Sequence, residues 1–531
     1  MDQRKFDVLT KLLAGSVSRR AGVIGAFAAL VGVANVPEAD ANKLAERRRE
    51  RRQEQGQCRH AGTPCATSDE CCSGRCKLKK DGRTRCTKPR NHPAKPGKKK
   101  HKKKGGGGGG GGIVIGGACD PQTDTCASPG ATCTTYLDRS PSGTYCLYAN
   151  GSTCAASNQC ASSNCQGTCA AQVCTVCANG CAQTTVQGAI TAANPGDVIR
   201  IDSGTYTEDL TITKNLTLAN CNGSDVVLRN ASDSRRTIIL GDENNTSLNP
   251  ALILVSVDIT MNDSFQYGGC IKAWGSVELY GDTDIHDCVV YESGGGIYQL
   301  SGAPRWVKMW DDSQIRDNQA DGGGGIYNGA GGSTIELHHD AAVTGNRTES
   351  SGGGGISSDA YNSVVRMYDR SSVTYNTSDN ETGGILLGGN DANEFEMHHD
   401  SSVSHNTAEG GDYGGIYQGG GDWVLDGNAA IHDNRSVTGA GGGVGGSNST
   451  INMSGNAAVR NNRCQGRGGG FNNGNTTVLN LSGNAVIEYN TSDTTGPGGV
   501  YDGEVHITEN ASIANNTPNN CQSVEGDCPD D

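Results

Sequence analysis

The chain has 531 residues, 79 of them glycine, and a net charge of −13. So much glycine excludes a long α-helical solenoid, because each glycine inside a helix costs about 1 kcal/mol. The charge is unevenly divided: residues 1–104 contain 27 basic and 10 acidic side chains, whereas the remainder contains 17 and 47. We therefore expect a basic N-terminal region attached to an acidic body.

Residues 1–41 have the features of an export signal. Arg19 and Arg20 precede an apolar run at residues 21–34, and residues 39–41 (Ala-Asp-Ala) fit a small-x-small cleavage site. Paired arginines before an apolar core predict the twin-arginine route. An uncleaved anchor is the alternative, although 14 apolar residues are short for a membrane span. We expect a protein that is extracellular or on the cell surface after cleavage of this signal.

Residues 42–57 are a charged segment, and residues 58–86 contain six cysteines in a compact module. A module of this size needs disulfides to be stable. The spacing C-x6-C-x5-CC-x3-C-x9-C resembles that of the inhibitor cystine knot (knottin) family. That resemblance implies three pairs, namely Cys58–Cys72, Cys65–Cys76 and Cys71–Cys86. Zinc binding with His60 is the alternative.

Residues 87–118 are predicted to be a linker. Residues 98–104 are lysines interrupted only by His101, and residues 105–112 are all glycine. The lysines repel one another and the glycines are flexible. A basic segment of this kind favours contact with an anionic cell envelope, through cell-wall polymer or lipid headgroups. A solvated spacer is the alternative, and specific nucleic-acid binding is disfavoured because no aromatic residues interleave the lysines.

Residues 119–181 form a second cysteine-rich module, with eleven cysteines. The pattern Cys174-x-x-Cys177-x3-Cys181 fits a metal or redox site, but disulfides are the better interpretation in an exported chain. An odd number leaves one cysteine to pair outside the module, and Cys221 is the expected partner. The chain total of 23 cysteines leaves at least one thiol free or intermolecular.

Residues 182–517 are predicted to be one repetitive domain. Residues 182–193 are expected to form a short helix that caps its open end. Strands are expected at 198–201, 210–212, 216–218, 226–228, 237–240 and 252–260. Cys521 and Cys528 are expected to fasten the tail at residues 518–531.

Nine repeats follow, each of which opens with glycines and one apolar residue. These anchor residues are Ile271, Ile297, Ile326, Ile356, Ile385, Ile416, Val444, Phe471 and Val500. Each anchor is followed by two apolar residues two positions apart and by a third, as in Val307, Met309 and Ile315. Three residues after the third lies an asparagine in eight repeats, and Cys288 in the first; the asparagines are Asn318, Asn346, Asn376, Asn406, Asn434, Asn462, Asn490 and Asn516.

This repeat predicts an all-β fold. Alternation with a period of two marks short strands with one buried face. We interpret the glycines and asparagines as turn residues, because both tolerate positive φ. A single coil cannot bury its apolar face, whereas stacked coils share a continuous core. We therefore expect a right-handed parallel β-helix of about 12 coils, preceded by two small disulfide-rich modules.

Two motifs connect this domain to known families. The GG-[IVF] opening and the [VI]-x-x-N close resemble the repeats of chlamydial polymorphic outer-membrane proteins and of related bacterial β-helix repeat proteins, although those proteins have Phe where this chain has Val or Ile. The segment AITAANPGDVIRIDSGTYTEDLTITKNLTLANC is similar to the start of many pectin-lyase-like β-helices. The resemblance implies a secreted or surface protein, often an adhesive one.

One row of aromatic residues predicts a binding site. Stacked coils place equivalent residues about 4.8 Å apart. Directly after the apolar pair, the first five repeats have Tyr280, Trp310, His338, Tyr368 and His398. Such a strip of rings could stack on the sugar rings of a polysaccharide or cell-surface glycan. The alternative is that the rings stack on one another and only stabilise the sheet.

A neighbouring row of carboxylates predicts a calcium site. Asp282, Asp312 and Asp340 occupy equivalent positions on adjacent coils, and calcium would offset their repulsion. Hydrogen bonds within the turns are the alternative. Apart from calcium, the sequence predicts no cofactor.

An enzymatic function is the alternative to binding, because many β-helices cleave polysaccharides. Asp311, Asp312, Arg366 and Asp369 are the best candidates for the acids and the uronate-binding cation of a polysaccharide lyase or glycoside hydrolase. The motifs His338-His339-Asp340 and His398-His399-Asp400 lie two coils apart, too far to share an ion. Because no constellation breaks the repeat, we favour a glycan-binding or adhesive display scaffold. The sequence does not predict an oligomeric state.

Overall fold

The computed structural model describes residues 174–528, except 233–235, 246–247, 262–268, 301–303, 389–391, 475, 495 and 523, together with the backbone of four earlier strands. The chain divides into two units, Met1–Gly108 and Gly109–Asp531. The predicted export signal, the charged segment, the linker and the knottin-like disulfides lie outside the described residues.

The first unit is described at one hairpin. Strands β1 (Cys76–Leu78) and β2 (Thr84–Cys86) pair antiparallel, which places Cys76 opposite Cys86. In the second unit, β3 (Ala131–Tyr136) and β4 (Gly143–Tyr148) form another antiparallel hairpin. Both hairpins lie within the two regions predicted to be cysteine-rich modules.

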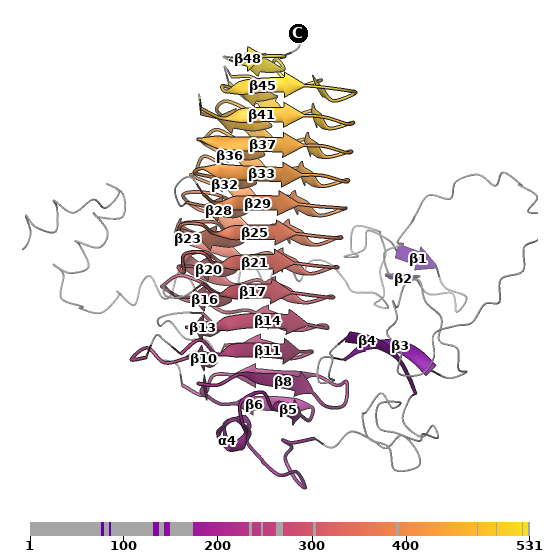
Figure 1. Ribbon diagram of the computed structural model, residues 1–531, viewed down its shortest axis with the longest axis vertical. Coiled ribbons are helices and arrows are strands. Elements are labelled where there is room, and N and C mark those ends of the chain that lie inside the picture. The colour runs from indigo at the N-terminus through magenta and orange to yellow at the C-terminus, as the bar shows by residue number, and fades with distance from the viewer. Residues whose placement is uncertain are drawn as a thin grey trace, which may run out of the picture. The chain divides into compact units, whose positions relative to one another are not determined.

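Residues 174–528 form a parallel β-helix. The chain winds in successive turns, and the strands of these turns stack into three long sheets around one core (Figure 1). Each strand pairs in parallel with the equivalent strand of the turns before and after it, as Val307 of one turn does with Ile335 of the next. The all-β fold is thus confirmed, with one short helix, α4 (Val186–Ala192), at its start.

Sheet 1 contains the anchor residues that follow the glycines. Its 12 strands are β7 (Leu210–Ile212), β10 (Ile238–Leu240), β13 (Ile271–Ala273), β16 (Ile297–Gln299), β20 (Ile326–Asn328), β24 (Ile356–Ser358), β28 (Ile385–Leu387), β32 (Ile416–Gln418), β36 (Val444–Gly446), β40 (Phe471–Asn473), β44 (Val500–Tyr501) and β47 (Cys521–Gln522).

Sheet 2 contains the apolar pairs. Its 13 strands are β5 (Val198–Ile201), β8 (Leu216–Asn220), β11 (Ala251–Val255), β14 (Ser276–Tyr280), β17 (Trp306–Met309), β21 (Thr334–Leu337), β25 (Val364–Met367), β29 (Glu394–Met397), β33 (Gly421–Leu425), β37 (Ser449–Met453), β41 (Val478–Leu481), β45 (Glu504–Ile507) and β48 (Glu525–Gly526).

Sheet 3 contains the third apolar residue of each repeat. Its 12 strands are β6 (Gly204–Thr207), β9 (Val226–Arg229), β12 (Asp258–Thr260), β15 (Asp284–His286), β18 (Gln314–Arg316), β22 (Ala342–Thr344), β26 (Ser372–Thr374), β30 (Ser402–Ser404), β34 (Ala430–His432), β38 (Ala458–Arg460), β42 (Val486–Glu488) and β46 (Ser512–Ala514).

A fourth sheet was not predicted from the sequence. Its seven strands are β19 (Gln319–Gly322), β23 (Arg347–Ser351), β27 (Thr377–Ser378), β31 (Thr407–Ala408), β35 (Arg435–Ser436), β39 (Arg463–Cys464) and β43 (Thr491–Ser492). Most of these strands are two residues long and polar, so they carry no hydrophobic alternation that the sequence could reveal.

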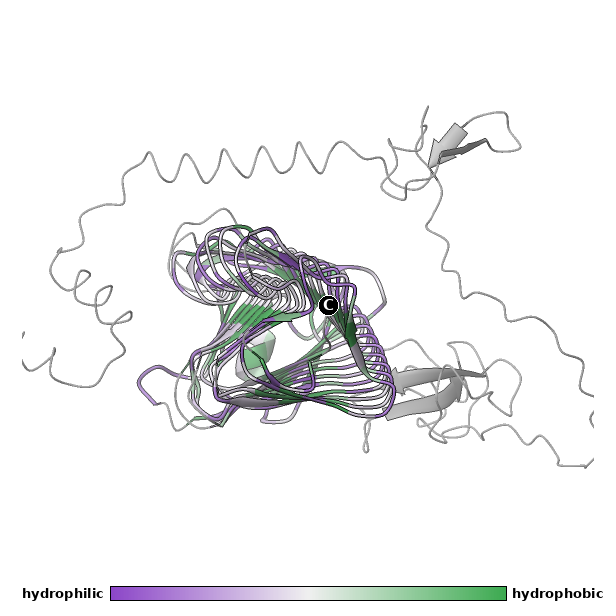
Figure 2. Cartoon of the chain, turned by 90° about the horizontal axis from the view of Figure 1, so that it is seen from above, coloured by the Kyte–Doolittle hydropathy of each residue, from purple (hydrophilic) through white to green (hydrophobic). Residues whose placement is uncertain are grey.

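The core is formed by the repeated apolar positions. Val307, Met309 and Ile315 are fully buried, and their equivalents in the other repeats are buried as well, except Ile507 of the last repeat, which is partly buried. Viewed from above, the coils superpose, with apolar residues along the strands and polar residues in the loops between them (Figure 2). The solenoid makes about 10 turns, compared with the 12 predicted, because strands such as β5, β6, β47 and β48 belong to incomplete turns at its ends.

The repeated asparagines build a buried ladder, which corrects their interpretation as turn residues. Asn376 donates from its backbone N–H and from Nδ2 to Oδ1 of Asn406, at 2.9 and 3.0 Å. The same Nδ2 also donates to the Val343 carbonyl at 3.0 Å. The positive φ falls on the preceding residue instead, for example Tyr375 at 56°. Asparagine is needed because its amide satisfies buried backbone groups of the adjacent turn.

The paired glycines are needed for close approach rather than for positive φ. A Cβ on Gly414 would lie 2.4 Å from the Gly442 carbonyl oxygen, and one on Gly415 would lie 2.4 Å from that of Gly443. Both contacts are with backbone atoms, which cannot move aside without breaking the sheet. The corner between sheet 4 and sheet 1 is therefore too tight for any side chain.

The first turns differ from the sequence prediction in detail. The expected helix at 182–193 is shorter, and the strand expected at 252–260 is divided into β11 and β12. The break falls at Ser256, whose φ of 54° turns the chain between sheet 2 and sheet 3. A continuous apolar run does not reveal such a corner, because residues on both sides of it face the core.

Four disulfides lie among the described residues. Cys221, the partner expected for one cysteine of the second module, pairs with Cys174; Cys177 pairs with Cys181, and Cys521 with Cys528. Cys288, for which no partner was predicted, pairs with Cys270. The expected free thiol is present at Cys464, which is buried. Burial raises the pKa of this thiol to about 11, so it stays protonated and unreactive in the folded protein.

Candidate functional site

The turn from sheet 2 to sheet 3 presents three outward-facing residues in every repeat. In the second repeat these are Trp310, Asp311 and Asp312, which follow the buried Met309. The middle residue has a positive φ, 60° at Asp311, which explains the glycine found there in several repeats. Because the turn is identical from coil to coil, each of the three positions forms a straight row.

The first row is a continuous stack of rings. The centroid distances are 5.9 Å for Tyr280–Trp310, 3.7 Å for Trp310–His338, 4.7 Å for His338–Tyr368 and 5.0 Å for Tyr368–His398. Neighbouring planes are within 13° of parallel. The structure thus brings together all five residues predicted for ligand binding. Their neighbours cover the flat faces of the three central rings, so a ligand can reach only the edges of those rings.

The second row alternates carboxylates with imidazoles. Asp311 Oδ1 lies 3.1 Å from His339 Nδ1, and Asp369 Oδ1 lies 3.3 Å from His399 Nδ1. The His339 backbone N–H also donates to Asp369 Oδ2 at 3.1 Å. His339 is 52% exposed and His399 is 62% exposed. This Asp–His row therefore offers hydrogen-bond donors and acceptors to solvent at a regular spacing.

The third row contains the predicted calcium ligands. Asp340 forms an ion pair with Arg370, with 2.6 Å between Oδ1 and Nε. Further along, Asn428 donates from Nδ2 to Asp400 at 2.8 Å. Asp282, Asp312 and Asp340 are not among the groups of three ligating atoms that converge in the described part of the chain. The calcium site stays a prediction.

Arg366, the cation of the enzymatic alternative, is committed to ion pairs. It donates from Nε to Glu396 at 2.9 Å and from Nη2 to Glu394 at 2.8 Å. Glu336 lies 3.9 Å away on the previous turn and pairs with Lys308 at 2.8 Å. Burial alone would raise the pKa of Glu336, but the hydrogen bond and charge of Lys308 lower it overall. The alternating charges of this row therefore stabilise the outer face of sheet 2.

The four residues of the enzymatic alternative do not form one cluster. Asp311 and Asp369 share the Asp–His row, two turns apart, with His339 between them. Asp312 belongs to the third row and Arg366 to sheet 2. Two carboxylates on alternate turns are about 10 Å apart at the usual strand spacing, which is slightly beyond the carboxyl separation of about 6.5–9.5 Å in inverting glycosidases.

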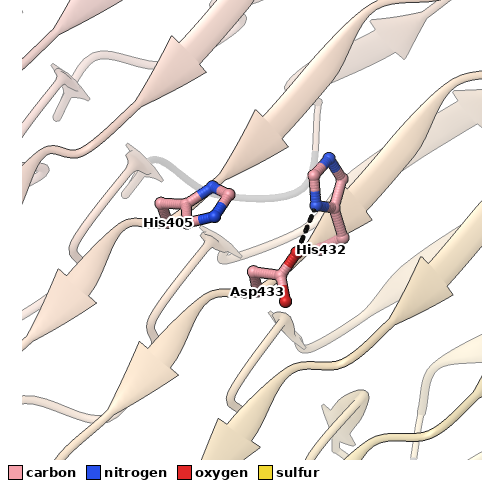
Figure 3. A group of neighbouring side chains, drawn as sticks. All are labelled: His405, His432 and Asp433. Atoms are coloured by element: carbon pink, nitrogen blue, oxygen red, sulfur yellow. Dashed lines mark hydrogen bonds and ion pairs between the residues drawn. The ribbon is translucent and has the colours of Figure 1, made fainter. Parts of the chain in front are cut away.

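A histidine pair on another row was missed by the sequence analysis. His405, His432 and Asp433 bring three ligating atoms within 4.8 Å of one another (Figure 3). His405 and Asp433 occupy the same position in the fifth and sixth repeats, directly before the buried asparagine. Aligning the repeats by their asparagines would have revealed this juxtaposition from the sequence.

Comparison of the chain with family models, with curated proteins and with solved structures gives no match. Within the described ranges, no helix is long and apolar enough to span a membrane. The fold and the site geometry therefore have to support any functional conclusion.

Proposed function

We propose that this protein is a secreted or cell-surface scaffold whose β-helix binds an extended glycan along the turns between sheets 2 and 3. One observation carries the proposal: the ring stack and the Asp–His row run side by side over successive turns and end together. In the sixth repeat the two positions change to Asp426 and Gly427. The ligand surface is thus confined to the N-terminal half of the nine repeats.

The chemistry of the two rows fits a polyhydroxylated polymer. Carboxylates accept hydrogen bonds from sugar hydroxyls, and a neutral imidazole can donate one and accept another. The edges of the rings supply an apolar border for the C–H groups of a pyranose. Because equivalent groups recur about every 4.8 Å along the solenoid, an extended chain can repeat the same contacts on successive turns.

Rigidity also favours binding by this surface. The turns are fixed on both sides by parallel sheets, and each ring is held by its neighbours. Little conformational entropy is then lost when a ligand docks. The row is therefore already arranged for binding before the polymer arrives.

The test is retention of the full-length protein on a glycan array, followed by variants of the two rows. Asp369→Ala removes an exposed acceptor, and we expect it to weaken retention about 10-fold or more, since a charge-assisted hydrogen bond contributes about 1.5–3 kcal/mol. Trp310→Ala with Tyr368→Ala should weaken it further. Tyr361→Ala is the matched control, because Tyr361 is 61% exposed but lies on a different loop.

Circular dichroism spectra would show that each variant keeps its fold. Undiminished retention in the Asp369 and ring variants would contradict the proposal. Assays for new reducing or unsaturated ends test the enzymatic alternative on the same polymers. A binder leaves the polymer intact, whereas a lyase or hydrolase releases such ends.

A further inference from the structure

His405, His432 and Asp433 form a compact group outside the glycan surface (Figure 3). His432 ends β34, and Asp433 is the next residue, with a φ of 55°. His405 occupies the position of Asp433 one turn earlier, with a φ of 57°. Its backbone N–H donates to the His432 carbonyl at 3.3 Å, so the two turns are fixed relative to each other.

We propose that these three side chains bind a divalent metal ion that prefers imidazole, with Zn²⁺ as the representative. The two imidazoles and the carboxylate each offer one ligating atom, and these atoms all lie within 4.8 Å of one another. Two ligands of a tetrahedral zinc ion lie roughly 3.4 Å apart, given bonds of about 2.1 Å. Rotations of the three side chains would bring their ligating atoms to this separation.

The surroundings hold the rings in place while leaving them accessible. Tyr375 stacks on His405, with 4.8 Å between the centroids. His432 Nδ1 lies 2.8 Å from Asp433 Oδ2, the contact that a metal ion would replace. His405 and Asp433 are exposed and His432 is half-buried, so the ion can enter from solvent and keep water or an anionic ligand in its open positions.

The charges facing the group are consistent with a bound cation. Asp433 supplies one negative charge. The strand pairing places Ser404 beside His432 on the preceding turn and Arg460 beside it on the following turn. Ser404 is uncharged, and Arg460 is exposed, where the high dielectric constant of water weakens its repulsion of the ion. Two imidazoles favour zinc, copper or nickel over calcium and magnesium, which prefer oxygen ligands.

The chain contains its own matched control. His286 and Asp287 repeat the His432–Asp433 pair at equivalent positions, with 3.1 Å between Nδ1 and Oδ2. One turn earlier, the position of His405 is occupied by Met261. The His286 pair therefore lacks the second imidazole, and the proposal predicts that it does not hold the ion.

The experiment measures zinc bound by the oxidised full-length chain, by calorimetry and by metal analysis after gel filtration. His405→Ala and His432→Ala are each expected to lose one bound zinc ion relative to the unsubstituted protein, whereas His286→Ala loses none. Comparison with the unsubstituted protein removes the contribution of other histidines and of the cysteine-rich modules. Cobalt substitution gives a second readout, because visible absorption from this site should disappear in His405→Ala.

Three results would overturn the proposal. They are equal zinc content in all variants, loss of zinc in His286→Ala to the same extent as in His405→Ala, and displacement of zinc by an equal concentration of calcium. The side chains of His286, His405, His432 and Asp433 are exposed or half-buried, so circular dichroism should confirm that the variants remain folded. Asp433→Asn keeps a hydrogen-bond acceptor but loses the charge, and it is expected to bind zinc more weakly than the unsubstituted protein.

Discussion

At the scale of single residues, the buried asparagines show how a small polar side chain can connect neighbouring coils. Asn434 accepts from both the backbone N–H and Nδ2 of Asn406, each at 3.0 Å. Asn434 in turn donates from its backbone N–H and from Nδ2 to Oδ1 of Asn462, and its Nδ2 also donates to the Val403 carbonyl. Each residue of the ladder therefore satisfies groups on two other turns.

Asn434→Ala should destabilise the protein by about 3 kcal/mol or more, because several buried polar groups lose a partner at about 1–3 kcal/mol each. The measurement is the midpoint of urea unfolding. Asn428→Ala is the matched control, since Asn428 belongs to an exposed row of amides, and it should change the free energy of unfolding by about 0.5 kcal/mol or less. Similar effects of the two substitutions would refute the role of the buried ladder.

Asp258 should make stability depend on pH. Burial, followed by the nearby charge of Asp284, raises the pKa of Asp258 from 3.8 to about 6. The Asp258 carboxyl therefore binds a proton more tightly in the folded state than in the unfolded state. The stability that this proton contributes to the fold is lost as pH rises from about 4 to 6. Asp258→Asn should therefore stabilise the fold at pH 8, by an amount on the order of 1 kcal/mol.

Thermal melting of both proteins at pH 8 and at pH 4 checks this prediction. The advantage of Asp258→Asn should shrink towards pH 4, where the carboxyl of the unsubstituted protein is protonated in the folded state. An advantage of the same size at both values would show that charge is not the cause.

At the scale of elements, the glycine corners set how closely sheets 4 and 1 can approach. Gly414→Ala should cost about 1–3 kcal/mol, because the new Cβ would lie 2.4 Å from a backbone oxygen. Gly474→Ala is the control, since its nearest neighbour would be 3.5 Å away and its φ is not positive. Denaturant unfolding should separate the two variants, and equal midpoints would refute the explanation.

The ring stack is also an element-scale feature, because no single ring has the same neighbours without the turns on either side. Its five members were predicted from their spacing, and their mutual stacking was one of the two alternatives. The stack shifts the expected glycan contacts from ring faces to ring edges and to the adjacent Asp–His row.

At the scale of the whole molecule, the chain combines a rigid acidic β-helix with a basic N-terminal region. We propose that the lysine-rich residues 98–104 attach this body to an anionic envelope. Deleting residues 88–104 should abolish attachment to cells at low salt, whereas the full chain should detach as salt rises. Cell-binding assays over a range of salt concentrations measure this effect, and unchanged attachment of the deletion variant would contradict it.

The sequence by itself determined the repeat, the buried positions and the parallel β-helix, because the period of two and the constant spacing admit only one way to bury the apolar residues. It also predicted that one cysteine of the second module pairs with Cys221, and that Cys521 and Cys528 fasten the tail. Only the tertiary structure decided the contacts between coils: the asparagine ladder, the close approach at Gly414, the disulfide of Cys270 with Cys288, and the meeting of His405 with His432. These contacts join residues 18 to 30 positions apart, and a side chain's partner there depends on the register of stacking rather than on local pattern.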